Sequence, residues 1–305
     1  MLKSSEHSAM DVLDAGRVSV NIAGIVFSTI SIDPRLRLEA GGATRRFTVE
    51  EAEAEVQVSA AWGELLETIE GELIFDSGAL WQLYRQHTDY VFRFVTPHFG
   101  ATPYKLASFN RDFTRGSVVL HRPYFDAARA VYPLDYPLDE LLMLNLLARG
   151  RGAELHSCGV VDGDGRGFLF LGQSGAGKTT TARLWEQREG AAILSDDRII
   201  LRSQDGRIRM YGTPWHGEGE LASAASAPLA GIFFLRHGEH NELEAVGRSE
   251  ASARLFSCGF PTFHDAAGLD FTLAFFDEVT RAVPCYELSF VPDERAVDFV
   301  REQRL

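Results

Sequence analysis

Cysteine is scarce in this chain of 305 residues. The three cysteines, Cys158, Cys258 and Cys285, are odd in number and far apart. That arrangement argues against a disulfide framework and against a cysteine-based metal site. We therefore expect small, buried side chains in the reduced state at these three positions.

Long apolar runs are also lacking. No stretch of about 18 apolar residues occurs, so we expect neither a transmembrane helix nor a membrane partner. The first residues are polar, unlike a signal peptide with its apolar middle, and the expected location is the cytoplasm. The formal net charge of −13 argues against nucleic acid as a partner, because phosphate binding needs a positive surface.

Lysine is the rarest charged residue. Of the 30 basic residues only three are lysine, at Lys3, Lys105 and Lys178. Because the chain otherwise uses arginine, a lysine inside a glycine-rich turn indicates a specific role.

That turn lies in the stretch FLFLGQSGAGKTTTARLW, residues 168–185, between an apolar strand-like run and a helical pattern. It matches G-x-x-x-x-G-K-[ST], in which glycines let backbone N–H groups converge on phosphate oxygens. The following helix presents its positive N-terminus to the same anion. We expect ATP here, with Lys178 between the β- and γ-phosphates and the Thr179 hydroxyl on Mg²⁺. The expected nucleotide-binding residues are Gly172, Gln173, Ser174, Gly175, Ala176, Gly177, Lys178, Thr179 and Thr180.

Two adjacent carboxylates follow the next apolar run, in AAILSDDRIIL. Ligands bind at the carboxyl ends of strands in open α/β sheets, so Asp196 and Asp197 are expected to face the turn. Neighbouring residues of an extended chain point to opposite sides, so one would reach the metal and the other the attacking hydroxyl. We assign Asp196 to Mg²⁺ and Asp197 as the general base, with the swapped assignment left open.

His156 lies on the run before the turn, in ELHSCGVV. If the intervening hairpin turn centres on Gly163 and Asp164, His156 pairs with Leu171, where the glycine turn begins. We therefore expect His156 to take part in catalysis, as a support for the base.

A loop with the sequence YGTPWHGEGE, residues 211–220, follows a further strand. It gathers Thr213, His216, Glu218 and Glu220 among turn-forming residues, as functional loops do. Glu218 is the candidate for metal or substrate binding.

Three segments are expected along the chain: a loose leader at 1–17, a β-rich accessory domain at 18–132, and a nucleotide-binding domain at 133–305. Short runs rich in β-branched and aromatic residues fill the β-rich accessory domain, which carries no catalytic motif. We expect this domain to pack on the nucleotide-binding domain or to recognise the substrate. A helix at 138–149 opens the third, where strands and helices alternate with several hairpins. This order predicts an α/β fold with a mixed sheet.

The runs LHSCGVV, GQSGAGKTT and LSDDRI, in this order and spacing, resemble HPr kinase/phosphorylase. The resemblance implies the phosphate-loop fold shared with phosphoenolpyruvate carboxykinase, and places His156, Asp196 and Asp197 at the transfer site. YGTPWHGE and the β-rich first half are more similar to the HPr-kinase-related proteins of peptide-modification systems, including kinases of lasso-peptide precursors. The E-I-R-G-L-G segment of HPr-specific enzymes is absent, which argues against HPr as acceptor and against the phosphorylase reaction.

The expected function is that of a Mg²⁺-ATP-dependent kinase. It would transfer the γ-phosphoryl group to a hydroxyl, that of Ser or Thr in a peptide or protein, or that of a small molecule. Two alternatives stay open. A carboxykinase-like enzyme acting on a dicarboxylate would need a cluster of cations, which arginines would have to supply. A non-catalytic ATP-sensing protein would not need Lys178, Thr179 and the aspartate pair together. A homo-oligomer is also left open.

Overall fold

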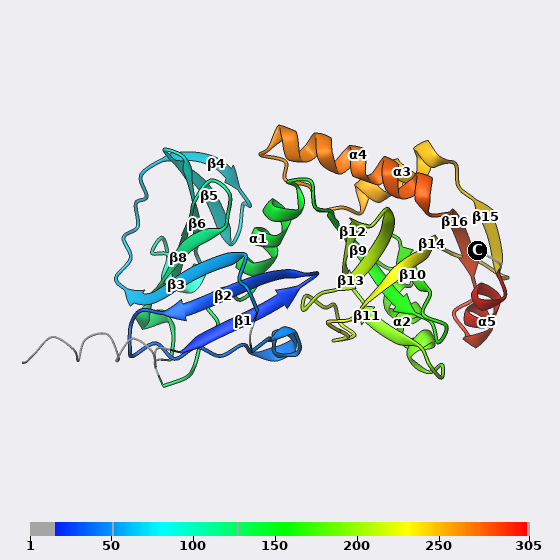
Figure 1. Ribbon diagram of the computed structural model, residues 1–305, viewed down its shortest axis with the longest axis horizontal. Helices are drawn as coiled ribbons and strands as arrows, with labels where there is room; N and C mark the ends of the chain where they lie inside the picture. Colours follow the sequence, from blue (N-terminus) through cyan, green and yellow to red (C-terminus); the bar gives the residue numbers. More distant parts are fainter. Residues whose placement is uncertain (1–15, 51, 127, 304–305) are drawn as a thin grey trace, which may run out of the picture. The chain divides into compact units, whose positions relative to one another are not determined.

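The computed structural model describes residues 16–50, 52–126 and 128–303, so most of the expected leader at 1–17 lies outside the described residues (Figure 1). The chain divides into two compact units, the first ending at Leu142 and the second beginning at Met143. Each unit is described by itself. The domain boundary expected at residue 133 stays a prediction.

The first unit is built on one mixed sheet of eight strands. Its order is β1-β2-β3-β8-β7-β6-β5-β4. The pairs β2–β3 and β3–β8 are parallel and the other pairs are antiparallel. The strands are β1 Arg17–Ile22, β2 Ile25–Ser31, β3 Val56–Gly63, β4 Glu72–Asp76, β5 Trp81–Gln86, β6 Asp89–Phe94, β7 Lys105–Phe109 and β8 Arg115–His121, with short 3-10 helices at Gly42–Phe47, Pro97–Phe99 and Arg122–Tyr124.

Helix α1, Leu138–Leu147, ends two residues before the expected Arg149. It precedes Gly150, whose φ of 84° is the left-handed conformation that ends many helices. Lys105 is fully buried in the first unit, and its ammonium bonds Asp135 at 2.6 Å. One of the rare lysines therefore has a structural partner.

The second unit carries the glycine turn on another mixed sheet, of order β10-β9-β12-β13-β14-β16-β15, with β11 beside β9. A further pairing of β10 with β14 closes the ring β10-β9-β12-β13-β14. The strands are β9 Ala153–Val161, β10 Gly167–Leu171, β11 Ala192–Ser195, β12 Arg198–Gln204, β13 Arg207–Gly212, β14 Ser226–His237, β15 Glu242–Ala245 and β16 Cys285–Phe290, and the helices are α2 Lys178–Glu186, α3 Arg248–Ser257, α4 Ala266–Ala282 and α5 Glu294–Glu302.

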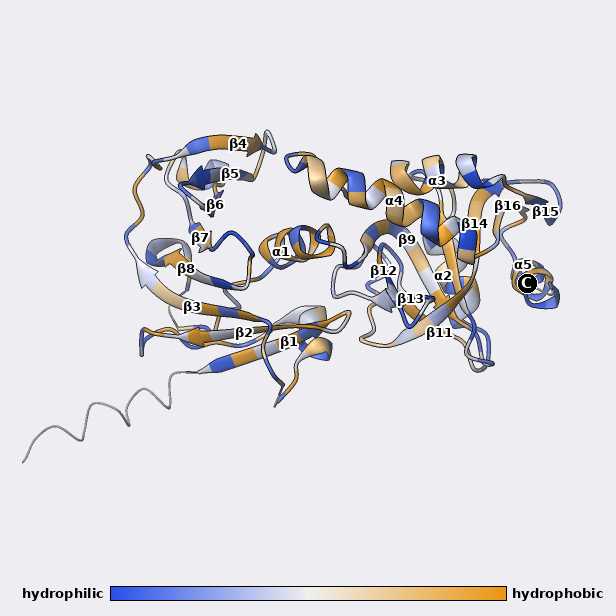
Figure 2. Ribbon diagram, turned by 45° about the horizontal axis from the view of Figure 1, so that its top comes forward, coloured by the Kyte–Doolittle hydropathy of each residue, from blue (hydrophilic) through white to orange (hydrophobic). Residues whose placement is uncertain are grey.

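Alternation along β10 separates two hydrophobic cores. Phe168 and Phe170 pack in the core that includes residues of α2 and α5, whereas Leu169 and Leu171 pack in the core that includes residues of α3 and α4. Strand β14 is buried on both faces, because Ile232 and Phe234 pack in one core and Phe233 and Leu235 in the other, which accounts for its orange stretch in Figure 2. The predicted α/β class with a mixed sheet is confirmed, while the likeness to phosphoenolpyruvate carboxykinase stays a prediction.

None of the helices in the described ranges is long and apolar enough to span a membrane.

Candidate active site

Strand β9 brings the predicted site residues together, because it has different neighbours on its two sides. On one side β10 ends with Leu171 opposite Ser157. On the other side β11 and β12 follow one another along β9, and both are antiparallel to it. Asp196 and Asp197 interrupt them, so the glycine turn and the aspartate pair flank the same point of β9.

The expected register of the β9–β10 hairpin is wrong by one residue. Leu171 lies opposite Ser157, and His156 pairs instead with Arg198 of β12. The cause is a five-residue loop, 162–166, in which Gly165 has a φ of 84°. A loop with an odd number of residues shifts the pairing by one position relative to the expected two-residue turn. His156 still lies beside the end of β10, because it directly precedes Ser157.

The side chain of Ser195 produces the interruption between β11 and β12. Its hydroxyl oxygen accepts hydrogen bonds from the backbone N–H groups of Asp197 at 3.2 Å and Arg198 at 3.1 Å. Serine commonly turns the chain in this way, because its hydroxyl replaces the partner that a strand would supply. The two aspartates lie in this turn.

The glycine turn has the conformation that its sequence requires. Gly175 and Gly177 have φ values of 83° and 104°, which L side chains rarely adopt. A Cβ on Gly177 would lie 2.8 Å from a ring carbon of Phe290. The ammonium of Lys178 donates to the carbonyl of Gly172 at 2.8 Å, and the imidazole of His237 contacts the carbonyl of Gly175 at 2.9 Å. The loop is thus supported from its own lysine and from the end of β14.

Burial lowers the pKa of Lys178, and the nearby Asp197 carboxylate opposes that shift. Because the ammonium is buried, a phosphate placed beside it would interact strongly with it.

Asp196 is bound by the loop that follows β13. Its two carboxylate oxygens accept hydrogen bonds from the N–H of Gly217 at 3.1 Å and the N–H of Gly219 at 2.8 Å. Only 2% of the residue is exposed. Besides any metal role, Asp196 therefore fixes the conformation of the 217–219 segment.

Asp197 points to another set of partners. One oxygen lies 3.1 Å from Nδ1 of His156, and the other accepts from the guanidinium of Arg198. Burial by itself raises the pKa of Asp197, but the hydrogen bond from His156 and the charges of Arg198, His156 and Lys178 outweigh it. The pKa therefore lies below its ordinary value, and the carboxylate is ionised at neutral pH.

These residues surround a cavity of about 370 Å³ in the second unit. Its lining comprises His156, Ser174, Gly175, Gly177, Lys178, Thr179, Thr180, Asp196, Asp197, Gly217 and Glu218. All expected catalytic and metal-binding residues are among them. Gly172, Gln173 and Ala176 belong to the turn but do not line the cavity; Gly172 and Gln173 present their carbonyls to Lys178.

The loop at 211–220 contributes less than expected. Glu218 lines the cavity with an exposed side chain, but Thr213 is buried and its hydroxyl donates to the carbonyl of Arg198 at 2.8 Å. His216 and Glu220 are exposed and do not line the cavity. Two residues of the site were not predicted from the sequence: Gly217, whose N–H binds Asp196, and Arg198, which contacts Asp197. The sequence did contain signals for both, since Gly217 is a glycine of the 211–220 loop and Arg198 directly follows the aspartate pair.

The donors at the cavity fit Mg²⁺ bound together with a nucleotide. In the described ranges, no three His, Cys, Asp or Glu side chains gather as a metal site. Mg²⁺ commonly takes one or two carboxylates and completes its shell with phosphate oxygens and water. The carboxylates of Asp196 and Glu218 and the hydroxyl of Thr179 are oxygen donors of this kind.

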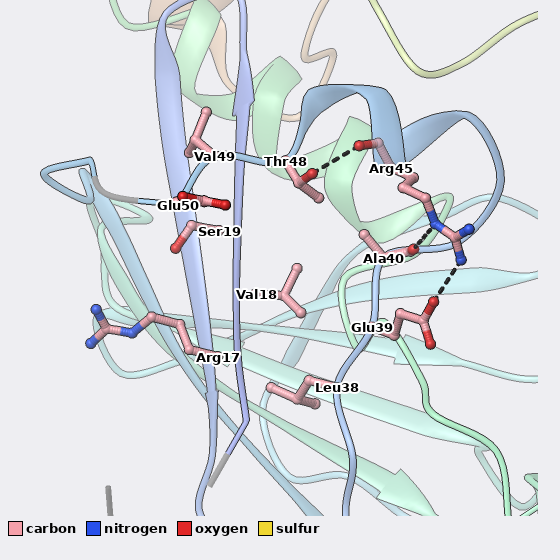
Figure 3. A pocket seen from close by; sticks show the side chains of 10 residues that line it. All are labelled: Arg17, Val18, Ser19, Leu38, Glu39, Ala40, Arg45, Thr48, Val49 and Glu50. Atoms are coloured by element: carbon pink, nitrogen blue, oxygen red, sulfur yellow. Dashed lines mark hydrogen bonds and ion pairs between the residues drawn. The ribbon is translucent and has the colours of Figure 1, made fainter. Parts of the chain in front are cut away.

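A larger cavity, of about 490 Å³, lies in the first unit between β1 and the segments 38–40 and 45–50 (Figure 3). Two arginines line it, Arg17 and Arg45, and Arg45 pairs with Glu39 at 2.6 Å. Four of its other lining residues are aliphatic: Val18, Leu38, Ala40 and Val49. It carries none of the expected site residues.

No family model and no curated protein matches the chain. Among solved structures, the HPr(Ser) kinase/phosphatase from Coxiella burnetii is similar to it at 13% sequence identity and a TM-score of 0.29, over 48% of this chain and 95% of that chain. A likeness at that TM-score supports neither a fold family nor an activity. The relation to peptide-modification systems stays a prediction.

Proposed function

We propose that the chain is a Mg²⁺-ATP-dependent kinase that transfers the γ-phosphoryl group to a hydroxyl of a peptide, protein or small molecule. One observation supports this function above others. The glycine turn with its lysine shares a single cavity with a carboxylate, Asp197, that contacts a histidine. Phosphoryl transfer needs these two parts: a cationic cradle for the phosphates and an acceptor for the hydroxyl proton.

Each residue has a chemical task in this proposal. Backbone N–H groups of the turn and the ammonium of Lys178 bind the phosphates and stabilise the charge that develops in transfer. Thr179 and Asp196 would bind Mg²⁺, which would neutralise part of the phosphate charge. Asp197 takes the proton of the attacking hydroxyl, and His156 holds that carboxylate in place.

The charges of the cavity disfavour the dicarboxylate alternative. Among the described residues that line the cavity, Lys178 is the one Lys or Arg. Three carboxylates line it as well, those of Asp196, Asp197 and Glu218. A dicarboxylate would face these acids while competing with the nucleotide phosphates for one lysine. A neutral hydroxyl has no such cost.

An ATP sensor would need the cradle but not a base. The contact of Asp197 with His156 favours an enzyme, because a carboxylate held beside a phosphate cradle is the arrangement of kinases.

The test compares ATP turnover in Lys178→Ala and Asp197→Asn with the wild type, in the presence of Ser- and Thr-containing peptides and small alcohols. In Lys178→Ala the rate of ATP turnover should fall at least about a hundredfold, because the ammonium no longer stabilises the phosphate charge in the transition state. Asp197→Asn should bind Mg²⁺-ATP nearly normally but transfer phosphate at least about a hundredfold more slowly.

Arg183→Ala is the matched control, because Arg183 is an exposed cation on α2 outside the cavity lining. Wild-type turnover in Lys178→Ala would refute the proposed function. If Asp197→Asn transferred normally while Asp196→Asn kept metal binding and lost transfer, the roles of the two aspartates would be exchanged.

A further inference from the structure

Arg198 is the first residue of β12, and its guanidinium contacts two side chains of the site, Asp197 and His156, and the buried Glu154. Nη1 contacts the carboxylate of Asp197 and lies 3.0 Å from Nδ1 of His156. Nε lies 3.5 Å from a carboxylate oxygen of Glu154, a side chain with no exposed surface. The Arg198 side chain itself is 17% exposed, so these contacts are made with little competition from water.

An aromatic ring fixes the plane of this guanidinium. Its central carbon lies 4.3 Å from the ring centroid of Phe260. Phe260 belongs to a segment tied along β9 by backbone bonds, from His156 N–H to the Cys258 carbonyl at 2.7 Å and from Phe260 N–H to the Glu154 carbonyl at 3.1 Å. The ring under Arg198 and the backbone of His156 are therefore positioned by the same segment.

The arrangement constrains His156. An arginine N–H is always a donor and a carboxylate is only an acceptor. Nδ1 of His156 lies within 3.1 Å of both, so it can donate to Asp197 or accept from Arg198, but not both at once. Whichever state holds, Arg198 keeps its own bond to the second oxygen of Asp197.

We infer that Arg198 is a positioning residue for phosphoryl transfer: its guanidinium, clamped by Glu154 and Phe260, fixes the orientation of the Asp197 carboxylate. This inference rests on the proposed kinase function. Arg198 does not line the cavity, so in this inference it acts through Asp197. A misplaced catalytic group can lower a rate by about a hundredfold without a change in affinity.

The chain provides a matched control in Arg166. This arginine also pairs with a neighbouring aspartate, Asp164 at 2.5 Å, and lies over a phenylalanine ring, that of Phe168 at 5.2 Å. It belongs to the β9–β10 hairpin and does not line the cavity. Arg166→Met therefore removes the same kind of contacts from a place without a catalytic part.

The experiment measures the transfer rate and the affinity for Mg²⁺-ATP in Arg198→Met and Arg166→Met. Since Arg198→Met leaves Glu154 buried beside an apolar side chain, Glu154→Gln/Arg198→Met serves as the second variant. We expect kcat to fall about tenfold to a hundredfold in both Arg198 variants, with nucleotide affinity within about threefold of wild type. Arg166→Met should keep the wild-type rate.

A double-mutant cycle distinguishes positioning from a structural role. In the Asp197→Asn background, Arg198→Met should have little further effect, because Arg198 acts through that carboxylate. Equal losses in both backgrounds would overturn the inference, as would a wild-type rate in Arg198→Met or a parallel fall of nucleotide affinity.

A spectroscopic readout needs no turnover. The nitrogen NMR resonance of His156 Nδ1, assigned by its loss in His156→Gln, should move in Arg198→Met and stay in place in Arg166→Met. An unmoved resonance in Arg198→Met would overturn the inference. Wild-type turnover in Lys178→Ala would instead refute the kinase function, so the two failures are distinguishable.

Discussion

Replacing Asp196 by asparagine tests whether this residue acts through the metal alone or also through the protein. Both carboxylate oxygens already accept backbone hydrogen bonds, from Gly217 at 3.1 Å and Gly219 at 2.8 Å. An asparagine has one acceptor oxygen, so its NH₂ group would meet one of the two N–H donors. Asp196→Asn should therefore loosen the loop even without metal and nucleotide.

The magnitude follows from the bond that is lost. A hydrogen bond to a charged group contributes about 1.5–3 kcal/mol, and burial of Asp196 leaves little screening to reduce it. With a central value of about 2 kcal/mol, the melting temperature of the second unit should fall by roughly 4–8 °C. A metal ligand alone would give no such change in the apo protein.

Thermal unfolding without ligand, with Mg²⁺, and with Mg²⁺ and ATP separates the two contributions. Glu218→Gln is the control, since Glu218 is an exposed carboxylate of the same loop that lines the same cavity. Gly219→Ala should reproduce the apo defect of Asp196→Asn, because its Cβ would lie 2.6 Å from an Asp196 oxygen. The reasoning is refuted if Asp196→Asn melts like wild type without ligand and loses only the Mg²⁺-dependent stabilisation.

Three further changes test other parts of the second unit. Gly177→Ala should lower nucleotide affinity at least about tenfold in titrations. Alanine rarely adopts the φ of 104°, and its Cβ would lie 2.8 Å from a ring carbon of Phe290, so the turn should be distorted. Gly165→Ala is the control and should keep the affinity, because Gly165 also has a positive φ but has open space around it. Thr179→Ala should weaken ATP binding more in the presence of Mg²⁺ than in its absence, and equal losses would contradict a metal role. The pKa of Glu287 lies below its usual 4.5, above all because of the hydrogen bond from Arg254, so its stabilisation is present above about pH 4.5 and is lost as the pH falls. Glu287→Gln should therefore lower the melting temperature near pH 7, and this difference from the wild type should shrink as the pH falls below about 4.5.

The glycine turn could be predicted from the sequence because its structure is local. The positive φ values of Gly175 and Gly177, and the helix that begins at Lys178, follow from residues within the turn. The cap of α4 is local in the same way, since the side chain of Asp265, the residue before the helix, accepts from the Ala267 N–H.

The position of His156 could not be fixed in this way. Its register depends on the number of residues in the hairpin loop, and a change from an even to an odd loop exchanges the partner of every residue on the strand. Strand β7 has only a weak signal in the sequence, because its run, KLASF, is short and mixes polar with apolar residues. The contacts of Arg198 were not predictable either, since they depend on β12 and the segment at 258–260 both lying along β9.

The aspartate pair shows how a local signal and a tertiary one combine. The sequence S-D-D contains the cause of the strand break, because the Ser195 hydroxyl satisfies the N–H groups of Asp197 and Arg198. A continuous strand would instead place these N–H groups in its ladder with β9, and the aspartates would alternate across a regular sheet. In the turn, Asp196 meets the loop after β13 and Asp197 meets His156, while both still line the cavity. Two chemically identical side chains thus receive different partners from one break in a strand, and this difference is what allows one to be proposed as metal ligand and the other as base.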